Sequence, residues 1–419
     1  MKIKVVILTL LVTSIVSSGA LAQGFLKKLA NKASNAGSDL IVKKTGEQAE
    51  KAIDGKKAKD AKEEKKTEAI SESNSSGSVT VYSKFDFVPG NQILLLEDFE
   101  QDAIGEFPLK WFTKGGGEIV TLKDLPGKWL ATTGGAALSP IIRFPENFTV
   151  EFDVFLNISA NSSSVLPGLS FQFFDGGEKL KRLDAYNYPL NNIMMFSNSF
   201  NYQRVIARLD SREKGKVKLL SDPGSLAGFQ RHYGSVVHVS MAVQKERVRL
   251  WYNEQKVMDI PIAVALNHNF NQMYILGNKK ADGSPGFYFS NFRIAQGDPD
   301  LRRKLEQGKF VTNGILFDHN SAQIRPSSYG LLKQLGQAIK ESKNRFNIIG
   351  HTDNIGSAPA NLSLSKKRAE AVRDFLIKEY GVDGSLLQTD GKGASQPVSD
   401  NKTGIGRAEN RRVEFIRTS

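Results

Sequence analysis

A carboxylate and a guanidinium lie close together in the segment GHTDNIGSAPANLSLSKKRA, residues 350–369. Asp353 follows the short apolar run 346–349, which predicts a strand, and Arg368 lies within a pattern typical of a helix. Opposite charges at the mouth of one strand–loop–helix unit can bind a small zwitterion at both ends. Arginine suits the second role because its planar fork pairs with both oxygens of a carboxylate.

A second motif, DNKTGIGRAENRRVEF, spans residues 400–415. In this order and spacing, GHTD, the NLSLSKKRA run and NRRVEF resemble the OmpA C-terminal family, the peptidoglycan-binding domain of Gram-negative envelopes. The resemblance covers residues 307–419. It implies that Asp353 accepts from the ammonium of diaminopimelate in a stem peptide, and that Arg368 pairs with its carboxylate. The other ligand-lining positions that it implies are Asn361, Thr352, Asp318 and Arg411.

Neighbouring residues receive more ordinary interpretations. Asn361 is expected either to bond the ligand or to hold the loop. Arg412 is expected to be structural or solvated, and His351 to make an orienting hydrogen bond rather than to catalyse. The five histidines have no metal-ligand spacing, and no glycine-rich phosphate loop follows a strand. The sequence therefore predicts no metal and no cofactor.

The elements that must position these residues can be read from hydrophobic spacing. Strands are expected at 310–317, 346–350, 386–391 and 411–416, and helices at 327–339 and 364–380. The order β-α-β-α-β-β predicts helices packed on one small sheet. Residues 298–306 form a short charged run, which is interpreted as a hinge before this α/β domain.

Composition limits the classes of function. The chain has 419 residues, which predicts two or more domains, and a net charge of +13. No nucleic-acid-binding signature accompanies that charge, so we predict no nucleic-acid partner and favour a polyanionic envelope polymer. The chain contains no cysteine, which excludes a disulfide, a thiolate metal site, a cysteine nucleophile and a lipidated cysteine.

The N-terminal part predicts export. Residues 1–22 combine Lys2 and Lys4, an apolar run and an Ala-Leu-Ala cleavage site, which is typical of a secretory signal peptide. Residues 23–78 comprise a basic helical segment and a Ser/Gly linker. The helix is either a solvated spacer or an amphipathic helix in peripheral contact with a membrane.

Residues 79–297 show alternating runs and predict an all-β sandwich or barrel. LLLEDFEQDAIGEFPLKW, FTVEFDVFL, VRLWYNEQKV and FYFSNFRI are similar to concanavalin A-like lectin/glucanase domains, which implies a jelly roll. The alternative is an eight-stranded outer-membrane barrel, but the strands are short and rich in arginine and lysine. The fold class expected is thus multidomain, with an all-β jelly-roll sandwich before an α/β OmpA C-terminal-like domain.

The same region raises the question of catalysis. Jelly-roll glucanases carry Glu-x-Asp-x-x-Glu, and Glu151-Phe152-Asp153 begins this pattern, but Leu156 and Asn157 supply no second glutamate. Glycosidase chemistry ordinarily needs two carboxylates in acid, base or nucleophile roles. Alternation predicts that Glu151 and Asp153 share one side of their strand and leave the apolar row around Phe152 to the core. We therefore predict that the protein is not an enzyme.

These observations together predict an exported periplasmic protein associated with the outer membrane or cell wall. It would bind peptidoglycan without turning it over, while its sandwich binds a glycan or an envelope protein. The alternatives are a polysaccharide-binding or polysaccharide-degrading envelope protein, or an outer-membrane barrel with a wall anchor.

Overall fold

The structure, a computed structural model, describes residues 85–113, 115–133, 135–159, 166–176, 192–297 and 301–418. The predicted signal peptide, basic helix and linker lie outside these residues. All described residues belong to one compact unit, which runs from Asn74 to Ser419. Within the described part of the chain, no helix is both long enough and apolar enough to span a membrane.

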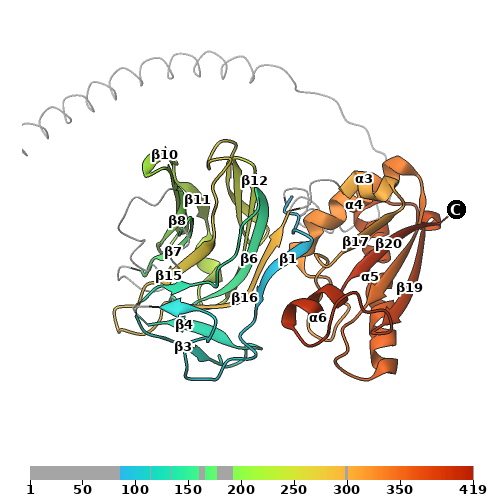
Figure 1. Cartoon of the computed structure of the whole chain (residues 1–419), viewed down its shortest axis with the longest axis horizontal. Coiled ribbons are helices and arrows are strands. Elements are labelled where there is room, and N and C mark those ends of the chain that lie inside the picture. The colour runs from blue at the N-terminus through green and yellow to red at the C-terminus, as the bar shows by residue number, and fades with distance from the viewer. Residues whose placement is uncertain are drawn as a thin grey trace, which may run out of the picture. The chain divides into compact units, whose positions relative to one another are not determined.

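Residues 92–296 build two open antiparallel sheets (Figure 1). The first has the order β14-β13-β12-β6-β16-β4-β3, with β1 paired to β16, and the second has the order β10-β9-β8-β7-β15-β5-β2, with β11 paired to β9. The strands of the first sheet are β1 (Gln92–Glu97), β3 (Gly117–Val120), β4 (Trp129–Thr132), β6 (Asn147–Leu156), β12 (Val236–Gln244), β13 (Arg247–Tyr252), β14 (Gln255–Ile260) and β16 (Phe287–Gln296). Those of the second are β2 (Phe112–Thr113), β5 (Ala137–Leu138), β7 (Leu169–Phe174), β8 (Asn192–Phe200), β9 (Arg204–Glu213), β10 (Lys216–Leu220), β11 (Gly224–Ala227) and β15 (Gln272–Gly277). A short 3-10 helix, η2 (Phe229–His232), precedes β12.

One hydrophobic core joins the two sheets into a sandwich. Strand β6 shows why: its alternate residues from Phe148 to Leu156 are buried in this core, as the alternation predicts. Across the core, the ring of Phe152 meets that of Phe171 on β7 edge to face, with centroids 5.6 Å apart. Trp111 and Trp129 are also buried, so neither is an exposed sugar-stacking platform.

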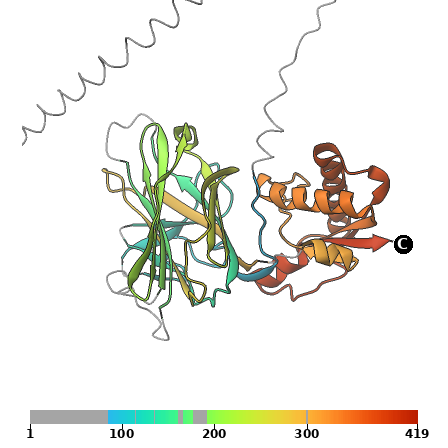
Figure 2. The same ribbon diagram turned by 90° about the horizontal axis from the view of Figure 1, so that it is seen from above.

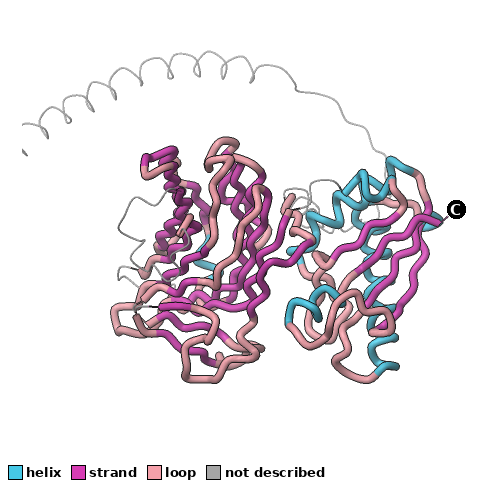
Figure 3. The backbone as a smooth tube through the Cα atoms, viewed as in Figure 1, coloured by secondary structure: helices cyan, strands magenta, loops and turns pink. Residues whose placement is uncertain are grey.

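The C-terminal part is a mixed sheet with helices; Figure 3 shows its cyan helices beside magenta strands. Its strand order is β17-β20-β18-β19, with β18 and β19 parallel. The elements are α3 (Leu301–Glu306), β17 (Lys309–Thr312), η3 (Pro326–Ser328), α4 (Tyr329–Ser342), β18 (Arg345–His351), α5 (Ala358–Tyr380), η4 (Gly384–Leu386), β19 (Leu387–Gly393), α6 (Gly404–Asn410) and β20 (Val413–Thr418).

Helical spacing fixes how these helices pack. Leu331, Leu332, Leu335 and Ile339 of α4 are all buried, as their spacing of three and four predicts. Helix α5 packs along β18 and β19. It ends at Gly381, whose φ of 61° is the left-handed conformation that glycine adopts most readily at a helix C-terminus.

Four elements differ from the sequence prediction. The strand expected at 310–317 ends at Thr312, and Phe317 forms only an isolated bridge with Ile324. The charged run expected to be a hinge contains helix α3, whose Leu301 and Leu305 are buried in the C-terminal core. Helix α5 begins six residues before the predicted start, at Ala358, because Pro359 in its first turn and Ser357 at its N-cap suit a helix start. Helix α6 was not predicted, since it is short and carries two glycines.

An entry segment, residues 85–91, precedes β1 and packs on the C-terminal part; it is the blue chain beside the orange helices in Figure 2. Phe85 and Phe87 are buried in the same core as the C-terminal helices and strands. Gly330 of α4 permits this approach, because a Cβ added there would lie 2.0 Å from the carbonyl oxygen of Phe87. On its other side, Phe87 packs against the ring of Trp251 in the sandwich, with centroids 5.3 Å apart.

Candidate functional site

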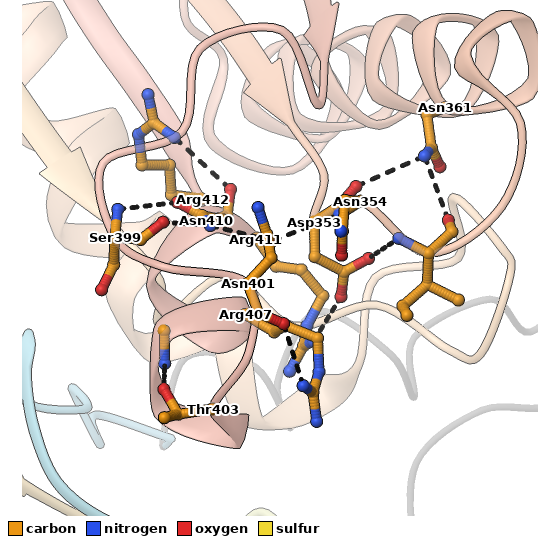
Figure 4. Close-up of polar contacts among 12 residues, drawn as sticks. Asp353, Asn354, Asn361, Ser399, Asn401, Thr403, Arg407, Asn410, Arg411 and Arg412 are labelled. Atoms are coloured by element: carbon orange, nitrogen blue, oxygen red, sulfur yellow. Dashed lines mark hydrogen bonds and ion pairs between the residues drawn. The ribbon is translucent and has the colours of Figure 1, made fainter.

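The loop after β18 holds Asp353 in a fixed position. Strand β18 ends at His351, and Asp353 is only 8% exposed. Its Oδ1 accepts a hydrogen bond from the backbone N–H of Ile355 at 3.1 Å, which closes a tight turn. Asn361, in the first turns of α5, donates from Nδ2 to the carbonyl oxygens of Asp353 and Ile355, at 3.3 and 3.0 Å (Figure 4). Asn361 thus holds the loop, one of the two roles expected for it.

The charged partner of Asp353 in this structure is Arg411. One terminal nitrogen of Arg411 donates to Asp353 Oδ2 at 2.6 Å (Figure 4). The Arg411 side chain is 43% exposed, so this ion pair lies at the protein surface and a ligand can reach it. Each carboxylate oxygen of Asp353 therefore accepts one hydrogen bond within the protein and retains further acceptor capacity.

Arg368 adopts a different arrangement. Its guanidinium carbon lies 4.9 Å from the centre of the Phe317 ring, and its Nε donates to the carbonyl oxygen of Ser321 at 2.9 Å. Burial, together with the positive charge of Arg411, lowers the pKa of Arg368 below its usual value. Among the described contacts only Nε is bonded, so the two terminal nitrogens remain available for a carboxylate.

The remaining predicted residues are distributed unevenly around this centre. Thr352 is 5% exposed, and its Oγ1 has no hydrogen-bond partner within the described structure. Asp318 is exposed and pairs with Arg325 at 3.2 Å. Asp318 is connected to Arg368 through the adjacent Phe317, on which Arg368 stacks, and through Ser321. The N–H of Ser321 donates to the carbonyl oxygen of Asp318, and its own carbonyl oxygen accepts from Arg368. The structure thus brings Asp353, Asn361 and Arg411 into direct contact and leaves Asp318 outside that contact.

A cavity of about 130 Å³ lies next to these groups. Among the residues that line it are Phe317, His351, Arg368, Arg411 and Arg412. Phe317 and Arg368, which stack on each other, thus both line the cavity. A small cationic cavity of this kind favours a carboxylate.

His351 makes no orienting hydrogen bond through its ring, contrary to the sequence expectation. The residue is 3% exposed, and neither ring nitrogen makes a hydrogen bond in the described structure, although Nε2 lies 3.4 Å from Glu414 Oε1. Burial and the nearby charge of Arg412 lower the pKa of His351 to about 4, so the ring is neutral at pH 7. Arg412 itself is buried and pairs with Glu414 at 2.7 Å, which is a structural role.

Sequence reasoning missed the groups that support Arg411. Asn410 is fully buried; its Oδ1 accepts from the backbone N–H groups of Val398 and Ser399, and its Nδ2 donates to Asn401 (Figure 4). Thr403 caps α6 by accepting from the N–H of Gly406 at 3.0 Å. The threonine at this position is an N-cap signal that could have predicted α6.

The second cluster of charges, in the sandwich, is arranged as a set of ion pairs. Glu151 pairs with Arg293 at 2.8 Å, and Asp153 accepts from Nδ1 of His238 at 2.6 Å. Burial alone would raise the pKa of Glu151 and Asp153, but the hydrogen bonds and charges of their partners outweigh it and lower both. The same two carboxylates raise the pKa of His238 to about 10, against the opposing effect of burial. A general acid needs the opposite shift of its carboxyl pKa.

The C-terminal sheet and its helices form a small α/β domain. The paired residues Asp353 and Arg411 are its candidate ligand site. The model of the OmpA family matches residues 316–411, and the chain belongs to this family. Outer membrane protein A of Bordetella avium is 38% identical over 137 residues, which are 32% of this chain and 69% of that protein.

Two further relatives are similar over the same domain. Outer membrane porin F of Pseudomonas aeruginosa is 43% identical over 101 residues, which cover 24% of this chain and 29% of the porin. Peptidoglycan-binding protein ArfA of Mycobacterium bovis is 40% identical over 108 residues, 25% of this chain and 33% of that protein. The chain therefore spans about a third or less of the length of these two relatives.

Proposed function

We propose that the C-terminal domain binds peptidoglycan non-covalently and anchors an exported envelope protein to the cell wall. The observation that carries this proposal is the pairing of a fixed carboxylate, Asp353, with the uncommitted fork of Arg368 near one cavity. The domain is similar to a protein whose name describes peptidoglycan binding, which supports the same conclusion. The excess of basic over acidic residues in the whole chain favours an anionic polymer.

The ligand group is the zwitterionic end of diaminopimelate. Its carboxylate pairs with the terminal nitrogens of Arg368, and its ammonium shares Asp353 with Arg411. Thr352 contributes its unpartnered hydroxyl, and Asn361 holds the loop in place. Asp318 does not contact Asp353. It is paired with Arg325 and follows Phe317, on which Arg368 stacks, so its effect on the ligand is indirect.

Co-sedimentation of the full chain with purified sacculi tests this proposal. Arg368→Ala and Asp353→Ala should each weaken binding at least about tenfold, because each removes charge-assisted contacts of roughly 1.5–3 kcal/mol. The matched controls are Arg373→Ala and Asp374→Ala, in the helix that carries Arg368. Arg373 and Asp374 pair with each other at the surface, so these substitutions should leave binding unchanged. Undiminished sedimentation of both site variants would refute the proposal.

The remaining predictions extend this function. Residues 1–22 would direct export, which places the protein in the periplasm in association with the outer membrane or wall. The names of the relatives, a porin and an outer membrane protein, support an envelope location. N-terminal sequencing of the protein purified from envelopes should find a chain that begins near Gln23, and retention of Met1 would contradict it.

For the sandwich we propose a concanavalin A-like jelly roll that binds a glycan or an envelope protein without catalysis. The paired state of Glu151 and Asp153 supports this view, since both carboxyl pKa values are lowered and both groups face charged partners. Incubation with β-glucans and peptidoglycan should release no new reducing ends. Release that disappears in Glu151→Gln would instead favour the polysaccharide-degrading alternative.

A further inference from the structure

The cavity beside Arg368 is not built by the C-terminal domain alone. Ile93 and Leu96 of β1 line it together with Arg368 and Arg411, and so does Arg293 of β16. Strand β1 also contacts helix α6, which lies beside it in Figure 1. The sandwich therefore supplies one wall of the cavity that Arg368 and Arg411 line.

A β-bulge explains why two residues of β1 with this spacing can face the same cavity. Residues three apart in a regular strand point to opposite faces. The pairing of β1 with β16 shifts register between Ile93 and Leu95, and the extra residue resets the alternation. Leu94 and Leu95 consequently pack against the sandwich core, whereas Ile93 and Leu96 line the cavity.

Hydrogen bonds hold this wall in place at the start of β1. The second terminal nitrogen of Arg293 donates to the carbonyl oxygen of Gly90 at 2.6 Å and to Asn313 Oδ1 at 2.7 Å. Asn313 in turn donates to the carbonyl oxygen of Asn91 at 3.1 Å. Because Asn313 follows β17, these bonds tie the last residues of the entry segment, directly before β1, to the loop that carries Phe317.

The charges in the cavity are distributed unequally. Arg293 is neutralised by Glu151 and uses both terminal nitrogens within the protein. Arg368 has no carboxylate partner among its described hydrogen bonds, whereas Arg411 is paired with Asp353 and Arg412 with Glu414. A ligand carboxylate is thus directed to Arg368, while the side of β1 offers only apolar contact. This combination suits an alkyl chain that ends in a charged head.

We propose that strand β1 is part of the wall-binding pocket, and that Ile93 and Leu96 pack against the alkyl chain of the diaminopimelate side chain while its zwitterionic head meets Arg368 and Asp353. The proposal rests on the function proposed above. It makes these two sandwich residues determinants of ligand length and assigns the two domains to one binding site.

The test compares two probes that share a zwitterionic head, meso-diaminopimelate and D-alanine, as competitors of the full chain for sacculi. The wild-type protein should prefer diaminopimelate, because only its chain reaches the apolar wall. Leu96→Ala and Ile93→Ala should each weaken diaminopimelate competition about fivefold and leave D-alanine unchanged, since each removes apolar contact area. Leu94→Ala is the matched control: it truncates a half-buried leucine of the same strand that faces the sandwich core.

The outcomes separate this proposal from the function on which it depends. If Arg368→Ala loses sacculus binding while diaminopimelate competes equally with Leu94→Ala and Leu96→Ala, the proposed wall binding stands and the role of β1 is refuted. Tighter binding by Leu96→Ala would also refute it, because β1 would then obstruct the pocket. Thermal unfolding of each variant, followed by circular dichroism, establishes that a selective loss for one probe does not come from a damaged fold.

Discussion

The two charged clusters of this protein use the same residue types and differ in the partners of their arginines. In the sandwich, Asp153 accepts from His238 and Asn291, and Arg293 donates to Glu151, Gly90 and Asn313. His238 Nε2 and Glu151 Oε1 make no hydrogen bond but face each other at 3.6 Å. In the cluster around Asp353 and Arg368, by contrast, Arg368 is bonded through Nε only among the described contacts and has no carboxylate partner.

This difference teaches that an arginine without a carboxylate partner, and not acidic or basic residues as such, distinguishes a candidate binding site from a structural cluster. Polar groups taken out of water are nearly always paired in folded proteins, so Arg368, which lines a cavity with no carboxylate partner among its described contacts, requires an explanation. A ligand supplies one. The following predictions test the comparison, beginning with the largest expected effect.

Breaking the sandwich cluster should affect stability strongly. Glu151→Ala removes the counter-ion of Arg293, which is 5% exposed, and an unpaired buried charge costs about 3–5 kcal/mol. Urea denaturation of the full chain measures this loss. Glu118→Ala removes an exposed glutamate of β3 and should change the free energy of unfolding by less than about 0.5 kcal/mol. Similar effects of the two substitutions would show that the cluster is not a structural unit.

Substitutions in the cluster around Asp353 and Arg368 should instead change sacculus binding and leave stability almost unchanged. Arg368→Lys keeps the charge but loses the planar fork and the stack on Phe317, so we expect sacculus binding to fall by about 1.5–3 kcal/mol. The free energy of unfolding should stay within about 1 kcal/mol of the wild type. Arg373→Lys on the same helix is the control. Full binding by Arg368→Lys would mean that a point charge suffices at this position.

The stability of the sandwich should depend on pH through His238. The carboxylates of Asp153 and Glu151 face its ring, and they are bonded in turn by Asn291 and Arg293. Together the two carboxylates raise the pKa of His238 to about 10. A raised histidine pKa stabilises the fold fully below the unfolded value of about 6.5, and this contribution is lost as the pH rises toward 10.

Denaturation of the wild type between pH 6 and pH 10 should therefore show a falling free energy of unfolding, with a slope of at most about 1.4 kcal/mol per pH unit from this group. His238→Gln should remove most of this slope. The pKa values of Glu151 and Asp153 are lowered in the folded state. The stability that these carboxylates contribute is therefore lost on acidification. A wild-type profile identical to that of His238→Gln above pH 7 would contradict the assignment.

The smallest effect concerns the support of Arg411. Thr403→Ala removes the N-cap of α6 and should cost about 1 kcal/mol of stability. Sacculus binding should weaken slightly, because α6 ends at Asn410, directly before Arg411. Thr403→Ser keeps the capping hydroxyl and should behave as the wild type in both measurements. An unchanged unfolding curve for Thr403→Ala would show that the cap contributes nothing.

The sequence predicted those parts of the structure that depend on local pattern. The buried rows of α4 and β6 follow from spacings of three to four and of two, and both were located correctly. The start of α5 was missed because its first residues are small and polar and add nothing to an apolar stripe. Helix α3 was missed for a related reason, since only Leu301 and Leu305 are buried among its charged residues.

Pairings between distant residues could not be predicted in the same way. Arg411 was expected to line the ligand site, but its bond to Asp353 depends on the antiparallel pairing of β18 with β20. His238 meets Asp153 because β12 pairs with β6, and no local signal in the sequence indicates that register. The approach of β1 to the C-terminal domain depends further on a bulge and on the packing of the entry segment, which no motif reveals.

The entry segment also decides how the protein bears mechanical load. Phe85 and Phe87 are embedded in the C-terminal core before the chain enters the sandwich at Gln92, and the sandwich ends at β16, which pairs with β1. If residues upstream of 85 are pulled while the C-terminal domain is held by the wall, the tension passes through the entry segment directly into that domain. The sandwich shares this tension, because the ring of Trp251 packs against Phe87 and its Nε1 donates to Asp86 at 3.2 Å.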